Sequence, residues 1–210
     1  MQIHIKSIVP DFFTPASSEV WSKNFELDTD SSYLIQAVSG SGKSSFFNFL
    51  YGLNNRYSGT ILFDNNSIST FSECDWTNIR KHQISIVFQG LRLFPELTAF
   101  ENIQLKNGLT NHKSKPDILE MMSRLDIDQL ADKKAETLSY GQQQRVAIIR
   151  ALCQPFELLL LDEPFSHIDN TQIDNAIALI NQEVTKNNAT LVIASLGDTY
   201  NINYTKTFML

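Results

Sequence analysis

The residues best suited to chemistry form one glycine- and serine-rich stretch, Ala37-Val38-Ser39-Gly40-Ser41-Gly42-Lys43-Ser44-Ser45. Its two glycines let the backbone curl so that successive N–H groups point at one anion. Lys43 can reach the terminal phosphates of a nucleotide, and the Ser44 hydroxyl can ligate Mg²⁺. The stretch therefore indicates a phosphate-binding P-loop. A glycine-serine turn before an ordinary amphipathic helix is the alternative.

This loop departs from the general pattern G-x-x-x-x-G-K-[ST] at its first position, where Ala37 replaces glycine. The extra methyl group matters if that position requires a positive φ. The flanking residues still fit the motif, because 33–35 suit a buried strand and 46–50 carry apolar side chains at helical spacing. The loop thus occupies the strand-to-helix junction that a P-loop needs.

A second site is indicated where the apolar run Leu158-Leu159-Leu160-Leu161 ends in two adjacent carboxylates, Asp162 and Glu163. Ligands of parallel α/β sheets bind at the carboxyl ends of the strands. There, Asp162 would face Mg²⁺ and Glu163 would face an attacking water, as a base or as a positioning group. The alternative is that these acidic residues cap the helix that follows, which accounts for one carboxylate better than for two.

The third stretch is Leu138-Ser139-Tyr140-Gly141-Gln142-Gln143-Gln144-Arg145. Ser139 and Gly141 lie at an expected helix N-terminus, a place that binds anions. By physical reasoning alone, an ordinary capped helix explains this stretch equally well.

Around these stretches, apolar periodicity predicts strands alternating with helices, which favours an α/β fold with a largely parallel sheet. We expect one P-loop NTPase domain over 1–210, with an N-terminal antiparallel β part and an inserted helical subdomain at about 90–150. The expected strands are 3–8, 20–27, 33–35, 60–63, 84–88, 158–161, 190–194 and 205–210. The expected helices are 72–82, 98–105, 115–125, 139–152 and 171–187, and a turn is expected at 10–18.

Composition narrows the classes of protein. The 210 residues carry a formal net charge of −6, which argues against a dedicated nucleic-acid binder. The two cysteines, Cys74 and Cys153, lie far apart and are expected to be free thiols. The sequence shows neither a signal peptide nor an apolar run of about 18 residues, so we expect a cytoplasmic protein that meets a membrane only through a partner.

Together these stretches resemble the motifs of ABC-type ATPases, the nucleotide-binding subunits of ABC transporters. Leu138–Gln142 resembles the signature L-S-G-G-Q, with Tyr140 in place of glycine, and Val87-Phe88-Gln89 resembles the Q-loop. Ser166–Asp169 resembles the D-loop, and Leu93–Asn102 the stretch that follows the Q-loop. The 93–102 stretch and the short chain look most like the lipoprotein-releasing and macrolide-export branch.

The resemblance implies a role for each matching residue. Glu163, Gln89 and Lys43 would be catalytic, and Ser44, Gln89 and Asp162 would hold Mg²⁺. Phe12, or else Phe13, would stack on the adenine of ATP. The implied nucleotide-binding residues are Phe12, Ser39, Gly40, Ser41, Gly42, Lys43, Ser44, Ser45, Ser139, Gly141 and Gln142, with Ser139 and Gly141 contacting the γ-phosphate bound to the other protomer.

The implied partners are a transmembrane permease subunit and a second ATPase subunit, identical or different, packed head to tail. A coupling helix of the permease would meet the helical subdomain and the Q-loop. No nucleic-acid partner is expected, and a soluble ABC ATPase acting on nucleic acid or ribosomes is disfavoured by the acidic composition and the absence of a long heptad insertion. The protein would then sit on the inner face of the cell membrane.

The clearest departure from the family is in Val192-Ile193-Ala194-Ser195-Leu196-Gly197-Asp198, where Leu196 stands at the place of the switch histidine. With Ala37 and Tyr140, it favours the alternative of a nucleotide-binding regulatory or structural subunit with little ATPase turnover. His4, His82, His112 and His167 lie elsewhere and are expected at the surface or in packing.

Overall fold

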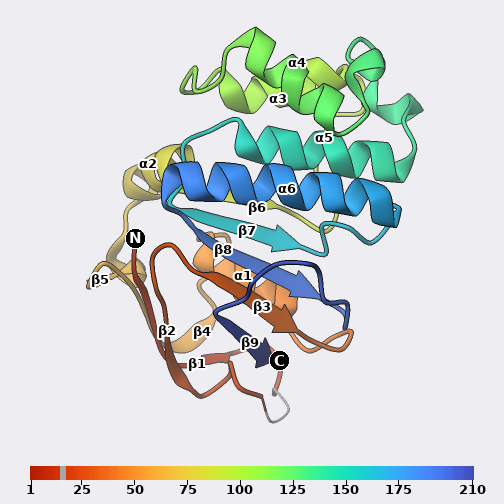
Figure 1. Ribbon diagram of the computed structural model, residues 1–210. Helices are drawn as coiled ribbons and strands as arrows, with labels where there is room; N and C mark the ends of the chain where they lie inside the picture. The colour runs from red at the N-terminus through yellow and green to blue at the C-terminus, as the bar shows by residue number, and fades with distance from the viewer. Residues whose placement is uncertain (15–17) are drawn as a thin grey trace.

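The computed structural model describes residues 1–14 and 18–210 and contains two β-sheets with helices around them (Figure 1). The larger sheet has five strands in the order β6-β7-β8-β3-β9, and all of its neighbours run parallel. Its strands are β3 (Ser32–Gln36), β6 (Ile84–Val87), β7 (Leu158–Asp162), β8 (Thr190–Ser195) and β9 (Lys206–Met209). The α/β class expected from the sequence is confirmed.

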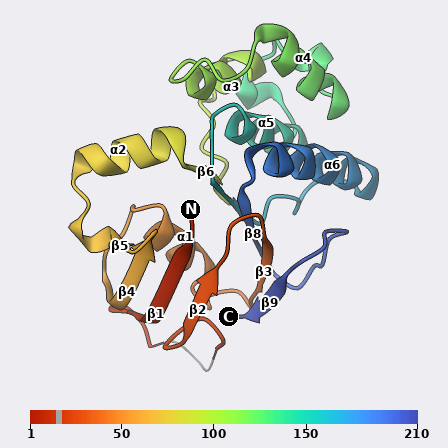
Figure 2. The same cartoon turned by 60° about the vertical axis from the view of Figure 1, so that its left-hand side comes forward.

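The smaller sheet is antiparallel, in the order β2-β1-β4-β5, and lies beside the parallel sheet (Figure 2). Its strands are β1 (Ile3–Pro10), β2 (Asn24–Leu27), β4 (Tyr57–Phe63) and β5 (Asn66–Ser67). Its three longer strands confirm the expected N-terminal antiparallel part, while the two-residue β5 was not expected.

One expected strand, 20–27, is wrong in its first half. The backbone N–H groups of Val20 and Trp21 donate to the Ser18 hydroxyl, and Ser22 has a φ of 59°. Both side chains are buried although their backbone turns, so their apolar character reflects the core rather than a strand. Residues 15–17 of the expected turn lie outside the described part of the chain.

Four of the helices begin at local capping signals. Ser72, Thr98, Ser114 and Ser139 each form a capping box with the residue three positions on. The helices are α1 (Lys43–Leu50), α2 (Glu73–His82), α3 (Ala99–Asn107), α4 (Lys115–Arg124), α5 (Tyr140–Leu152) and α6 (Asn170–Asn187). Short 3₁₀ turns cover Ile68–Thr70, Asp128–Leu130 and Ala135–Thr137. No helix in the described residues is long and apolar enough to span a membrane.

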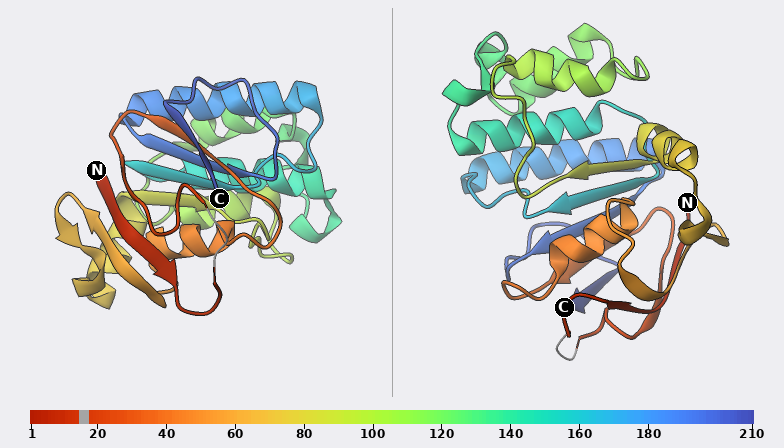
Figure 3. Two further views of the ribbon diagram at one scale, coloured as in Figure 1. Left: turned by 90° about the horizontal axis from the view of Figure 1, so that it is seen from below. Right: turned by 180° about the vertical axis from the view of Figure 1, so that it is seen from behind.

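The parallel sheet is buried on both faces, and the side chains of its central strands divide between two cores. In β7, Leu159 and Leu161 pack with α5 and α6, whereas Leu158 and Leu160 pack with α1 and the antiparallel sheet. The views from below and behind show α1 on the face of the sheet opposite α6 (Figure 3). This two-sided burial explains the uninterrupted apolar run of β7.

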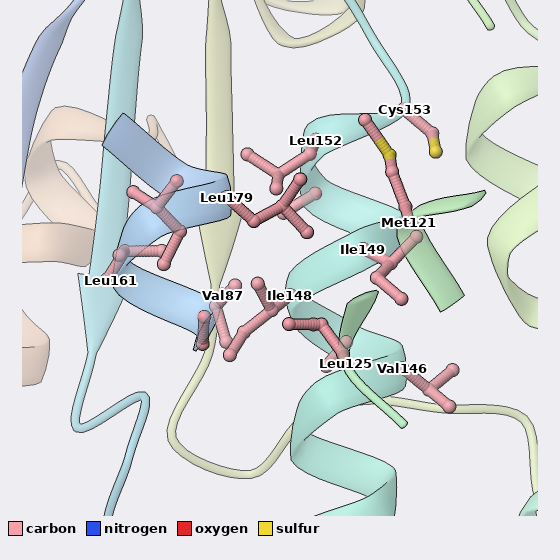
Figure 4. Packing of buried hydrophobic residues seen from close by; sticks show 14 of the residues in the cluster. Val87, Met121, Leu125, Val146, Ile148, Ile149, Leu152, Cys153, Leu161 and Leu179 are labelled. Carbon is pink, nitrogen blue, oxygen red and sulfur yellow. The ribbon is translucent and has the colours of Figure 1, made fainter. Parts of the chain in front are cut away.

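The helices α3 and α4 lie beyond α5 and α6, on the side away from the sheet (Figure 1). Side chains of α5, including Ile148, Ile149 and Leu152, fill the space between the sheet and α4 (Figure 4). These side chains belong to one continuous core that joins the parallel sheet to α3 and α4. That 90–150 forms an inserted subdomain stays a prediction.

Candidate functional site

The carboxyl ends of four parallel strands bring the sequence motifs to one edge of the sheet. Strand β3 leads into the P-loop, β7 ends at Asp162, β6 leads to Gln89, and β8 ends at Ser195. The register places Asp162 beside Ala194 of β8. A parallel sheet places the carboxyl ends of its strands at one edge, so motifs that are far apart in the chain lie close together there.

The P-loop has the curled backbone that its glycines predict. Gly40 and Gly42 have φ values of 81° and 102°, and α1 begins directly after Gly42. A side chain at Gly42 would come within 2.7 Å of Phe13 and 2.9 Å of Trp21. Ala37 has no positive φ, and its N–H donates to the Ser195 carbonyl over 3.1 Å. The alanine is therefore accommodated without backbone strain.

A cavity of about 370 Å³ lies at this loop. Most of the sequence-predicted residues of the P-loop line it, together with the Q-loop glutamine and the second carboxylate of the β7 pair. The lining residues are Phe13, Ser39, Gly40, Gly42, Lys43, Ser44, Ser45, Gln89 and Glu163. Ser41 is turned into the loop itself, where its hydroxyl donates to the Val38 carbonyl over 2.8 Å.

Within the cavity, the Glu163 carboxylate is held from two directions. Lys43 Nζ lies 3.0 Å from Glu163 Oε1, and Gln89 Nε2 donates to Glu163 Oε2 over 3.2 Å. Both partners of the ion pair are largely buried, which strengthens their attraction relative to a surface pair. The three residues assigned catalytic roles from the sequence thus form one connected group.

The neighbouring carboxylate, Asp162, is bound to the P-loop serine. Ser44 Oγ donates to Asp162 Oδ2 over 2.7 Å, while Asp162 Oδ1 is buried without a hydrogen-bond partner among the described residues. Burial raises the pKa of Asp162, and the nearby charge of Glu163 acts in the same direction. An orphaned carboxylate oxygen beside a hydroxyl is the kind of oxygen donor set that suits Mg²⁺.

The signature stretch caps α5 and does not line this cavity. Ser139 N donates to Gln142 Oε1 over 2.9 Å, and the Ser139 hydroxyl accepts from Gln142 N over 3.3 Å. Gly141 lies directly against the His167 carbonyl, where any added Cβ would collide. The glycine is therefore required for close approach of α5 to the segment after β7.

A polar network that the sequence did not predict links α5 to Glu163. The Gln144 side chain donates to Ser166 Oγ over 3.0 Å and to the Glu163 carbonyl over 3.4 Å. Its Oε1 accepts from the His167 backbone N–H over 3.0 Å. The available signal was the spacing of Gly141 and Gln144, three residues apart and therefore on one face of a helix.

The two aromatic candidates for an adenine contact are placed differently. Phe13 lines the cavity, whereas Phe12 is 42% exposed and has the Arg56 guanidinium 5.7 Å from its ring centroid. The rings contact each other edge to face, with centroids 5.4 Å apart. Stacking on adenine stays a prediction for this pair of residues, and Phe13 is the one next to the P-loop.

Leu196 directly follows β8, and the carboxyl end of this strand lies between the P-loop and Glu163. The Ser195 carbonyl accepts from Ala37 N, and Glu163 N donates to the Ala194 carbonyl over 3.0 Å. The Leu196 side chain is 52% exposed and offers no hydrogen-bond donor. His167, the histidine nearest in sequence to the β7 carboxylates, interacts through Nδ1 with Ser166 Oγ over 2.9 Å.

A family model described as ABC transporter matches residues 22–166, which include the P-loop, the signature stretch and the β7 carboxylates. The chain belongs to this family. This ABC protein is 37% identical over 177 residues to a glucose import ATP-binding protein of Saccharolobus solfataricus, covering 82% of this chain and 49% of that one. It is 32% identical over 170 residues to a lipoprotein-releasing system ATP-binding protein of Chlorobium chlorochromatii, covering 79% of this chain and 69% of that one.

A solved dimeric structure of a bacterial ABC transporter cassette superposes on this ABC protein with a TM-score of 0.80 at 27% identity. The match covers 92% of this chain and 88% of that structure. The chain spans 60% and 49% of the lengths of two of the relatives it matches. The relatives named for import and for lipoprotein release have similar identities, so the branch expected from the sequence stays a prediction.

Proposed function

We propose that this ABC protein binds ATP with Mg²⁺ and hydrolyses it to drive a separate membrane subunit. The observation that carries the proposal is the single cavity in which Lys43, Gln89 and Glu163 are joined to the P-loop. A cavity that combines a phosphate cradle with a buried carboxylate can both hold a triphosphate and activate water beside it.

The proposed chemistry follows from the contacts of Glu163. Lys43 Nζ exchanges Glu163 Oε1 for phosphate oxygens when ATP enters, which frees that carboxylate oxygen to accept a proton from water. Gln89 keeps the other oxygen in place. The P-loop N–H groups and the N-terminus of α1 neutralise the charge of the phosphates. Water then attacks the γ-phosphorus, and ADP and phosphate are the products.

The residues present fit Mg²⁺ at the β7 end of the cavity. The ion would be held by the Ser44 hydroxyl and the Gln89 side chain, with Asp162 behind them. It would neutralise charge on the β- and γ-phosphate oxygens. Its charge would also favour ionised Asp162, whose pKa is raised by burial in the structure.

A head-to-tail dimer is the proposed active form. Ser139 and Gly141 lie at the N-terminus of α5 and do not line the cavity of their own chain. Their position suits an anion presented by a second ATPase subunit. The solved cassette that superposes on the chain is dimeric, which supports a dimer. In the proposed arrangement, each site is completed by the other protomer.

The proposed partner in the membrane would dock on a second cavity of about 220 Å³, between α3, α5 and the Q-loop strand. It is lined by apolar side chains such as Phe94 and Leu105 and by the cations Arg92, Lys106 and Arg150. Burial lowers the pKa of Lys106 to about 8, and the charges of Arg150 and Arg80 add to this effect. A permease segment with apolar and acidic side chains would complement this groove.

Replacing Leu105 by aspartate is expected to reduce co-purification of a membrane subunit about tenfold or more, because it puts a charge into the apolar part of the groove. The side chain is 48% exposed, so the fold should tolerate the change. Leu53→Asp is the matched control, at 46% exposure on another surface. Equal recovery of the partner with both variants would place the docking surface elsewhere.

Lys43→Ala is expected to weaken ATP binding by about ten- to a hundredfold, because it removes a charge-assisted contact to the phosphates. Affinity is measured by calorimetry with ATP and Mg²⁺, and hydrolysis is measured separately on the same samples. Unchanged affinity would contradict the assignment of the P-loop. Binding without hydrolysis in the unaltered protein would favour the regulatory alternative.

A further inference from the structure

Tyr140 stands where the family signature has glycine, and the structure gives its side chain two contacts. Its hydroxyl donates to the Gln89 carbonyl over 2.9 Å. Its ring meets the His167 ring edge to face, with centroids 4.4 Å apart. A glycine at this position would make neither contact, because both depend on the tyrosine side chain.

Both contacts are connected to Glu163 through further hydrogen bonds. The Gln89 side chain donates to the Glu163 carboxylate, and the Glu163 carbonyl accepts from Gln144, which also binds the backbone of His167. Tyr140 therefore touches both the segment that carries Gln89 and the segment that follows Glu163. Such a clamp restricts how far the two segments can move apart.

The position of Tyr140 is fixed by the helix that carries it. Ser139 caps α5 through its capping box, and Gly141 lies against the His167 carbonyl. The hydroxyl consequently meets Gln89, 51 positions away in the sequence, from a capped helix N-terminus rather than from a loop.

We propose that Tyr140 is a positioning residue: its hydroxyl holds the backbone at Gln89 and thereby the orientation of the Glu163 carboxylate toward the attacking water. This inference rests on the proposed ATPase function. It assigns the tyrosine a role within its own chain, distinct from the contact of Ser139 and Gly141 with a second subunit. Leu196 cannot donate a hydrogen bond that would hold the water and Glu163 in line. The contacts of Tyr140 would instead help to keep Glu163 in position.

The decisive variant is Tyr140→Phe, which removes the hydroxyl and keeps the ring against His167. We expect kcat to fall about five- to tenfold, as for loss of one hydrogen bond, while KM for ATP changes less than twofold. Tyr140→Gly, which removes both contacts, should lower kcat at least as much. Tyr33→Phe is the matched control, since it also removes a hydroxyl that forms a hydrogen bond away from the cavity: the Tyr33 hydroxyl accepts from Asp28 N over 2.9 Å.

A double-mutant cycle tests whether the effect runs through Gln89. In a Gln89→Ala background, Tyr140→Phe should change kcat less than twofold, because the link to Glu163 is already missing. If Tyr140→Phe lowered kcat in the Gln89→Ala background as much as it does in the unaltered protein, that result would overturn the proposal. So would a Tyr140→Phe enzyme with the kcat of the unaltered protein, or one whose change is confined to KM.

Hydrogen exchange of the nucleotide-free protein tests, without any measurement of ATP hydrolysis, whether the Tyr140 hydroxyl holds the backbone at Gln89. Tyr140→Phe should speed exchange in 88–92 about fivefold and leave the strands of the parallel sheet unchanged. Unchanged exchange in 88–92 would show that the hydroxyl does not hold Gln89. Failure of the unaltered protein to bind or hydrolyse ATP, with exchange altered as expected, would instead contradict the proposed function alone.

Discussion

Replacing Glu163 by glutamine should lower the turnover of ATP by about 10²- to 10⁴-fold, the range typical of losing a general base. The amide preserves the shape of the side chain but cannot accept a proton from water at neutral pH. The carboxylate is the group that Lys43 and Gln89 jointly hold in the cavity, so the substitution acts on the chemical step. Single-turnover hydrolysis with purified protein measures it.

ATP binding should survive Glu163→Gln. The variant loses the ion pair to Lys43, which leaves the ammonium group free for the phosphates. Bound ATP that is not hydrolysed should then trap the dimer, which size-exclusion chromatography in ATP and Mg²⁺ detects when the complete set of partners is present. The trapped species should be absent with ADP.

The matched control for Glu163→Gln is Glu183→Gln. Glu183 forms another buried ion pair, with Lys113 Nζ 2.6 Å from its Oε2, and it does not line the P-loop cavity. Loss of this pair is expected to reduce stability without reducing kcat. If Glu163→Gln hydrolysed ATP at the rate of the unaltered protein, the role assigned to Glu163 would be wrong.

Leu196→His should raise turnover by about 10²- to 10³-fold, because it restores one preorganised donor to the site. The residue follows β8 at the edge that carries the P-loop and Glu163, and its side chain is 52% exposed, which leaves room for an imidazole. A histidine there would donate to the γ-phosphate and keep water and carboxylate in line. Affinity for ATP should change little, since Lys43 and the loop amides already hold the phosphates.

This expectation implies slow hydrolysis at the unaltered site, or a partner ATPase whose own site keeps a donor. Turnover and affinity are measured side by side in the reconstituted complex, with Leu196→Ala as the control that removes the leucine without adding a donor. A fast unaltered enzyme that gains nothing from histidine would show that another group supplies the contact, or that the alignment of 192–198 is wrong.

Much of the cavity follows from signals that are local in the sequence. Gly40, Gly42 and Lys43 identify the P-loop because curled backbone and charge are needed within a few residues. The apolar run before Asp162 predicts a buried strand, and the chemistry of its terminal carboxylates follows from their position at its end. Capping boxes likewise join residues only three positions apart, and four helices begin where such signals stand.

Other features depend on how distant segments pack. Val20 and Trp21 have the apolar character of a strand, yet the structure places them in a buried turn. Likewise, the sequence favoured Phe12 over Phe13 for the adenine contact, whereas the packing against Gly42 puts Phe13 at the loop.

The sequence by itself determined the family, the P-loop and the pair of carboxylates, because each is recognised from motifs of neighbouring residues. Only the tertiary structure decided that Tyr140 reaches Gln89 and that Gln144 reaches Glu163. Those contacts join residues 51 and 19 positions apart, and they exist because α5 docks closely against the segment after β7. Such docking is set by packing summed over a whole helix, which no short stretch of sequence specifies.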